Sequence, residues 1–230
     1  MRDHEVKCFL RFSGLQEGDL RVVRASDASL LHDSLTGVQA VIFGSTGRRS
    51  ITEEETSELS RLVRFVKRVD DHGVPMLGIN YGAHLLTLAF GGSVVRDLEK
   101  REIGSTEVRK TDQAANDPIL RHLPDRFVVQ QGHVDHIEAI PPGATPLLVG
   151  GEGEVELWAF EEKGIYASEV QLDLDKEQLI DRLVYYNESY IQEPGELASC
   201  ILHLQSSPDA TRFLPLFLSE VVQKHATVRA

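Results

Sequence analysis

A short glycine-flanked segment in the first half of the chain has the form of a sharp turn between a strand and a helix. It reads Gly78-Ile79-Asn80-Tyr81-Gly82 and ends an apolar run that begins at Val74. Glycines two residues before and two residues after the apex permit a strained backbone and a close approach of neighbouring chains. The apex side chain, Asn80, then projects at the start of a helix, where the helix dipole and free N–H groups favour negative charge.

The chemistry of Asn80 itself is limited. A carboxamide is neutral and planar, and it has no atom comparable to a thiolate as a nucleophile. Two interpretations stay open. Asn accepts unusual backbone angles better than most residues, so it is simply tolerated at the turn, or its amide contacts a ligand.

Other side chains that could do chemistry lie in the second half of the chain. His133, Asp135 and His136, together with Asp173 and Asp175, are residue types that bind metal ions. The spacing His-x-Asp-His matches no strong ligand signature, so we predict no metal site and no cofactor.

Apolar patterning predicts the elements that must position these residues. Buried strands are expected at Ala40–Phe43 and Val74–Ile79, and each precedes a helical pattern. This order is typical of an α/β fold with a mostly parallel central sheet and helices on both faces. The remaining predictions are strands at Val6–Phe12 (with Cys8 as a core residue) and Leu20–Val23, a capping box from Thr52 to Glu55, helices at Leu59–Val69 and Leu85–Phe90, strands between Ser93 and Val170 with a short helical exception at Pro118–Leu123, and helices at Lys176–Ile191, Glu196–Leu204 and Asp209–His225.

Composition excludes two classes of function. The chain has 230 residues and carries 24 Lys and Arg against 36 Asp and Glu, a net charge of -12. Such a surface repels nucleic-acid phosphates, so nucleic-acid binding is not expected. No apolar run approaches the roughly 20 residues needed to span a bilayer, and the charged N-terminus is not a signal segment. We therefore expect a cytoplasmic protein.

A set of short motifs gives the chain a resemblance to a known family. The segment Pro75-Met76-Leu77-Gly78-Ile79 and the turn after it resemble the strand and the Gly-x-Cys-x-Gly turn of class I glutamine amidotransferases. Further motifs follow in the family's order, and the His-x-Asp loop among them is similar to that of the branch related to GMP synthase. They are Gly44-Ser45-Thr46-Gly47, Gly91-Gly92-Ser93-Val94, Glu102-Ile103-Gly104, Gln131-Gly132-His133-Val134-Asp135 and Pro141-Pro142-Gly143-Ala144.

The resemblance implies a catalytic triad whose members are replaced here. Asn80 stands where the family has its cysteine. The segment Val170-Gln171-Leu172-Asp173-Leu174-Asp175 stands where the family has Val-Gln-Phe-His-Pro-Glu, which puts Asp173 at the histidine and Asp175 at the glutamate. Residues that the resemblance places around the pocket, and that we expect to contact a ligand, are Gly44, Ser45, Tyr81, His84, Gly132, His133 and Asp135.

Loss of all three groups predicts a protein that cannot hydrolyse glutamine. Our leading hypothesis is a binding or partner subunit of a biosynthetic, synthetase-type enzyme. One alternative is an enzyme whose rebuilt pocket uses Asp173, Asp175, His84 and His133 for acid–base chemistry on a small amide or acid. Another is a sensor that holds a small-molecule ligand.

The family resemblance ends near Ile191, which divides the chain into an amidotransferase-like domain, 1–192, and a helical extension, 193–230. The extension is rich in apolar side chains, and leaving these in water is unfavourable by about 25 cal/mol per Å². We expect it to pack on its own domain, and the alternative is a surface for self-association.

Overall fold

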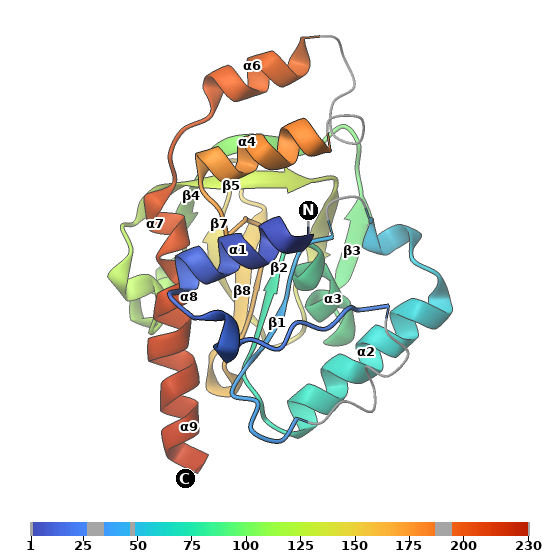
Figure 1. Ribbon diagram of the computed structural model, residues 1–230, viewed down its shortest axis with the longest axis vertical. Coiled ribbons are helices and arrows are strands. Elements are labelled where there is room, and N and C mark those ends of the chain that lie inside the picture. Colours follow the sequence, from blue (N-terminus) through green and yellow to red (C-terminus); the bar gives the residue numbers. More distant parts are fainter. Residues whose placement is uncertain (1, 27–34, 47–48, 187–194, 230) are drawn as a thin grey trace.

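The computed structural model describes residues 2–26, 35–46, 49–186 and 195–229 (Figure 1). Nine strands lie in this part of the chain: β1 Val41–Phe43, β2 Met76–Ile79, β3 Ser93–Arg96, β4 Glu102–Lys110, β5 Arg126–His133, β6 Asp135–Ala139, β7 Thr145–Val149, β8 Val155–Phe160 and β9 Ile165–Ser168. The α-helices are α1 Arg2–Ser13, α2 Thr56–Asp71, α3 Tyr81–Ala89, α4 Lys176–Tyr185, α6 Glu196–His203, α7 Pro208–Thr211, α8 Phe213–Leu216 and α9 Gln223–Arg229. A π-helical segment, η7 Phe217–Val222, joins α8 to α9. The short 3-10 helices are η1 Glu17–Asp19, η3 Ile51–Glu53, η4 Asp112–Asn116, η5 Leu120–His122 and η6 Glu161–Lys163.

A seven-stranded sheet forms the centre of the protein, in the order β1-β2-β9-β8-β7-β4-β5. The expected α/β class is therefore confirmed, with one correction to the sheet. Only β1, β2 and β9 pair in parallel, and the other neighbours are antiparallel, so the sheet is mixed rather than mostly parallel. Short turns link β7 to β8 and β8 to β9, and a short connection can only reverse the chain direction. Strands β3 and β6 form a separate antiparallel pair.

The two faces of the sheet carry two hydrophobic clusters, because successive side chains of a strand point to opposite faces. In β2, Leu77 and Ile79 join one cluster, and Met76 joins the other. In β8, Leu157 faces the first cluster and Trp158 the second. Helices α2 and α3 cover the second face, while α1, α7, α8 and η7 cover the first (Figure 1).

The C-terminal helices are part of this core. Phe213 and Phe217 are fully buried and belong to the same cluster as side chains of β4, β5, β7 and β8. Their rings pack edge-on against Tyr166 of β9, with centroids 5.9 Å apart in both cases. This arrangement favours packing on the chain's own sheet over self-association, and the division at residue 192 stays a prediction.

The first predicted strands are wrong. Val6–Phe12 lies in helix α1, and Cys8 is buried there at 3% exposure. Phe9 and Phe12 both pack on the core from this helix, a spacing that places them on one helical face. Leu20–Val23 forms no strand, and Val22 and Val23 are exposed, so no apolar face is buried there.

Two helix boundaries also differ from the prediction. Thr52 does not cap α2, which begins at Thr56 after Glu55, because the Thr52 hydroxyl interacts with Ser50 and Asp135 instead. Helix α4 ends at Tyr185, and the remainder of the predicted helix to Ile191 lies outside the described residues, apart from Tyr186. The other predicted helices are found, with the stretch after Pro118 forming the 3-10 turn η5. In the described part of the chain, no helix combines the length and the apolar character that crossing a bilayer requires.

Candidate functional site

The turn at Asn80 has the strained geometry that its flanking glycines indicate. Asn80 has φ 53° and ψ −113°, and it is the one non-glycine residue with positive φ in the described part of the chain. A Cβ on Gly78 would lie 2.5 Å from the carbonyl oxygen of Gly82, and a Cβ on Gly82 would collide with the carbonyl oxygen of Phe43. Both glycines are therefore required by close packing of the turn against itself and against β1.

Both polar atoms of the Asn80 side chain bind to the protein. Its Oδ1 accepts a hydrogen bond from the backbone N–H of Tyr81 (2.8 Å), which caps α3, and its Nδ2 donates to the carbonyl of Gly132 (3.2 Å). The backbone N–H of Asn80 donates to the carbonyl of Ser168 in β9 at 2.7 Å. The side chain thus ties α3 to the end of β5.

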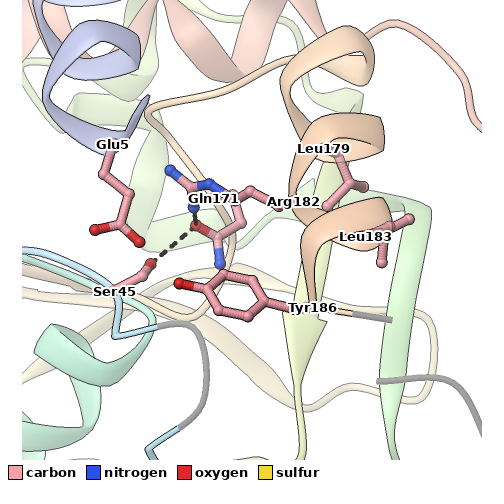
Figure 2. Close-up of a pocket in the computed structure, with 8 residues that line it drawn as sticks. Glu5, Ser45, Gln171, Leu179, Arg182, Leu183 and Tyr186 are labelled. Atoms are coloured by element: carbon pink, nitrogen blue, oxygen red, sulfur yellow. Dashed lines mark hydrogen bonds between the residues drawn. The ribbon is translucent and has the colours of Figure 1, made fainter. Parts of the chain in front are cut away.

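A small cavity (Figure 2) is lined in part by Gly132, the residue whose carbonyl accepts from Asn80. Its volume is about 20 Å³, which is room for one water molecule rather than for an amino acid. It is lined by Glu5, Ser45, Gly132, Gln171, Leu179, Arg182, Leu183 and Tyr186. Ser45 donates to Gln171 Oε1 (3.1 Å), and Arg182 Nη1 donates to the same oxygen (3.1 Å).

Helix α1 closes the cavity from one side. Glu5 points from α1 towards Ser45, opposite the α4 side chain Arg182 and the adjoining Tyr186 (Figure 2). Burial raises the pKa of the Glu5 carboxyl, and the nearby Arg182 guanidinium partly opposes that rise. Ser45 and Gly132, both expected at the site, do line it, whereas Gly44 precedes Ser45 in the loop after β1 and is not among the lining residues.

Asp173 and Asp175 have structural partners. Asp173 Oδ2 accepts from Arg182 Nη2 at 2.5 Å, and both side chains are buried. Asp175 is the N-cap of α4, where Oδ1 accepts from the backbone N–H of Lys176 (2.7 Å). The same oxygen accepts from the backbone N–H of Ser207 (2.5 Å), which joins α4 to the segment before α7.

His84 of helix α3 is buried against the carboxylate of Glu169. Its Nε2 lies 2.7 Å from Glu169 Oε1, and that oxygen also accepts from the backbone N–H of Ile137 (2.9 Å). Burial lowers the pKa of His84 and raises the pKa of Glu169. His84 therefore links α3 to the chain after β9 and does not line the cavity.

Tyr81 and Asp135 hold loops in place. The Tyr81 hydroxyl donates to Glu54 (3.0 Å), and burial raises the pKa of this phenol. Asp135 accepts from the Ser50 hydroxyl (2.6 and 2.7 Å to its two oxygens) and from the backbone N–H of Ile51 (2.8 Å). These contacts anchor the segment between β1 and α2, so the sequence positions expected to bind a ligand act largely within the protein.

The five residues considered as a metal cluster do not assemble. In the described part of the chain, Asp173 and Asp175 are engaged by the partners just described, and no group of converging donor atoms includes Asp135. His133 and His136 instead converge with Glu102 of β4, and Glu102 also lies near Glu154 and Glu156 at the start of β8. Burial among these carboxylates raises the pKa of Glu102 to about 7 and that of Glu156 to about 9.

Several of these functional groups were not predicted from the sequence. Arg182 has a signal, since it lies on the buried side of a helix with Leu179 and Leu183, where an unpaired charge is not tolerated. Glu5 has none, because it lies in the charged N-terminal segment just before the predicted strand Val6–Phe12. Glu156 sits within the apolar strand β8, and a carboxylate in such a strand is itself a signal of a buried polar contact.

Comparison with known proteins relates the chain to glutamine amidotransferases. The family model described as Glutamine amidotransferase class-I matches residues 20–168, more than half of the chain. A subunit of the glutamine-hydrolysing GMP synthase of Thermoplasma acidophilum is 30% identical over 144 residues, which cover 63% of this chain and 68% of that protein. The glutamine-hydrolysing GMP synthase of Sulfurimonas denitrificans is 35% identical over 95 residues, 41% of this chain and only 18% of that protein's length.

The fold is shared with solved structures at lower sequence identity. A glutamine amidotransferase from Methylobacillus flagellatus superposes with a TM-score of 0.68 at 14% identity, covering 95% of this chain and 88% of that one. The extent of the family match, together with the Asn80 turn between β2 and α3, identifies the chain as a member of the class I glutamine amidotransferase family.

Proposed function

We propose that this protein is a non-hydrolysing class I glutamine amidotransferase that acts as a partner of a biosynthetic enzyme and forms a complex with it. The observation that carries the proposal is the side chain at the apex of the turn. Asn80 is the residue that the sequence motif matches to the family's cysteine, and its amide is engaged by Tyr81 and Gly132. A carboxamide in this position starts no covalent step.

The two residues proposed at the histidine and glutamate positions support the same conclusion. Asp173 is neutralised by Arg182, and Asp175 caps a helix, so neither is free to activate a nucleophile or to protonate a leaving ammonia. The alternative enzyme, with acid–base work by these aspartates, His84 and His133, has less support. Each of its four groups is held by a protein partner.

The small size of the cavity argues against a substrate bound within it. A volume of about 20 Å³ does not accommodate glutamine, and Glu5 and Arg182 occupy the space around it. Binding of a small amide or acid at this place would require α1 to move. We therefore assign the function of the protein to its surface rather than to the turn.

The partner is inferred from the relatives. The Thermoplasma relative is by its name one part of a larger GMP synthase, and the full-length GMP synthases extend well beyond the segment matched here. We propose an ATP-dependent synthetase in the cytoplasm as the partner. The net charge of -12 suits docking to a basic surface on that enzyme.

Co-expression with a synthetase from the same genome that lacks its own glutaminase domain tests the proposal. The chain and the synthetase are expected to elute together from a size-exclusion column, and the complex is expected to form product with ammonia but not with glutamine. The variant Asn80→Ala should leave both results unchanged. Separate elution of the two chains contradicts the partner role, and glutamine-dependent product formation contradicts the loss of hydrolysis.

A further inference from the structure

Three metal-binding side chains converge at the end of the sheet where β4, β5 and β6 meet. Glu102 of β4 faces His133 of β5 directly in the strand register, and His136 follows on β6. One donor atom from each residue lies within 4.8 Å of the other two. The strands, rather than flexible loops, therefore fix these three side chains near one point.

Hydrogen bonding determines the tautomer of His133. Its Nδ1 lies 3.1 Å from the backbone carbonyl of Asp135, and a carbonyl can only accept, so Nδ1 carries the proton. In the neutral ring, Nε2 then presents a lone pair. His133 is buried at 4% exposure, which favours this neutral form.

Two oxygen atoms face that lone pair. Gln131 donates through its Nε2 to Glu156 (2.9 Å), which turns its Oε1 towards His133 Nε2 at 3.1 Å. Glu102 Oε2 lies 3.3 Å from the same nitrogen. A nitrogen lone pair, an amide oxygen and a carboxyl oxygen of Glu102 thus meet at one point.

Two neighbouring polar atoms also lack a hydrogen-bond partner among the described residues. The His136 ring lies 4.9 Å from the His133 ring, and among the described residues His136 Nε2 has no hydrogen-bond partner although it is buried. Glu156 is fully buried, and its Oε1 has no such partner either. Buried polar atoms are nearly always paired, so the unpaired atoms of this cluster indicate a partner from outside the chain, and converging imidazole and carboxylate donors suit a metal cation.

We propose that Glu102, His133 and His136 form a binding site for one divalent transition-metal ion of the zinc type. Two imidazoles and one carboxylate are a donor set that suits zinc, and three protein ligands leave a fourth position for water. Glu154 and Glu156 place further carboxyl oxygens beside Glu102. The Glu102 side chain is 27% exposed, which gives the ion a route from solvent.

This site is independent of the proposed partner role. It uses none of Asn80, Asp173 or Asp175, and the ion would connect β4 and β5 of the central sheet to β6 of the two-stranded sheet. Its failure would leave the proposal of a non-hydrolysing partner protein intact.

Metal titration of the full chain tests the site. Protein freed of metal by dialysis against a chelator is titrated with Zn²⁺ by calorimetry and with Co²⁺ by visible absorption. One equivalent is expected to bind, with the intense visible bands of a four-coordinate Co²⁺ ion. The variants Glu102→Gln and His136→Ala remove direct ligands. Loss of a residue that merely supports a ligand already weakens metal binding about 10–100-fold, so each variant should weaken it by about 100-fold or more.

Matched variants separate this result from non-specific binding. Glu107→Gln changes an exposed carboxylate on the same strand as Glu102, and His122→Ala removes an exposed histidine. Both should bind the metal like the unchanged protein. Circular dichroism of each metal-free variant establishes that it is folded. If His136→Ala does not fold, Glu102→Gln, which keeps the shape of the side chain, provides the test alone.

Three results overturn the proposal. The first is the absence of stoichiometric Zn²⁺ or Co²⁺ binding, which would mean that a proton on Glu102 satisfies His133 instead. The second is binding that Glu102→Gln and His136→Ala leave unchanged. The third is a preference for Mg²⁺ or Ca²⁺ over Zn²⁺, because imidazole donors do not favour those ions.

Discussion

The ion pair between Asp173 and Arg182 allows a quantitative test of the structural role given to Asp173. The substitution Arg182→Met keeps an unbranched side chain but removes the guanidinium. Asp173 then stays buried at 7% exposure without the cation 2.5 Å away, and Glu5 loses a neighbouring positive charge. Removing one partner of a buried pair leaves an uncompensated charge.

The expected cost is large for the single variant and small for the double variant. Breaking a buried ion pair typically costs about 3–5 kcal/mol, and we expect Arg182→Met to lower the free energy of unfolding by that amount. Asp173 Oδ1 and Arg182 Nε have no hydrogen-bond partner among the described residues, so the intact pair is incompletely satisfied. The double variant Asp173→Asn/Arg182→Met should therefore recover at least about 2 kcal/mol of the summed single losses.

Urea denaturation followed by far-ultraviolet circular dichroism gives the four free energies of the cycle. Arg126→Met is the control, because Arg126 pairs with Glu107 on the surface, where both side chains are more than half exposed. It should change the free energy of unfolding by no more than about 1 kcal/mol. A loss below about 1 kcal/mol for Arg182→Met, with no coupling in the double variant, would refute the structural role of Asp173.

Three further predictions concern the core, the turn and the N-terminal helix. Phe217→Ala should lower the free energy of unfolding by about 3–5 kcal/mol in urea denaturation, whereas Leu202→Ala, at a residue that is 79% exposed, should change it by no more than about 0.5 kcal/mol. Equal effects would contradict the packing of the C-terminal helices on the sheet. Asn80→Gly should be more stable than Asn80→Ala by about 1 kcal/mol in the same assay, because both lose the bond to Gly132 but only glycine relieves the positive φ; a more stable alanine variant would contradict the strain. Burial raises the pKa of Cys8 to about 11, so its reactive thiolate is scarce at pH 8 and increases only as the pH rises towards 11. Alkylation followed by mass spectrometry should modify Cys8 at pH 8 only after unfolding, and rapid modification of the native protein would contradict its burial.

The turn and its surroundings could be predicted because their signals are local. The glycines around Asn80 and the apolar run before it specify a strand, a strained apex and a helix within ten residues. Which side chains lie on each face of the sheet was harder to predict, because apolar strands such as β8 show no regular alternation of polar and apolar residues. The antiparallel half of the sheet depends on which strands become neighbours, and that is decided by packing over the whole chain.

The N-terminal helix and the converging side chains could not be predicted for a related reason. Val6–Phe12 carries apolar residues at spacings compatible with both a strand and a helix, and contact with the C-terminal helices decides for the helix. Glu102 and His133 are far apart in sequence, and only the register of β4 on β5 brings them together. A resemblance based on short motifs matches positions in the sequence but does not show which side chains contact them. It therefore did not reveal that Arg182 neutralises Asp173.

The central claim is that the turn at Asn80 no longer supports glutamine hydrolysis. Ammonia and glutamate release from glutamine, measured with the purified full chain, tests it directly. We predict no release above buffer for the unchanged protein, for Asn80→Ala or for Asn80→Cys, because the position matched to the family's histidine is Asp173, whose carboxylate pairs with Arg182 and cannot replace an imidazole. Glutamine turnover by the unchanged protein that Asn80→Ala abolishes would contradict the account.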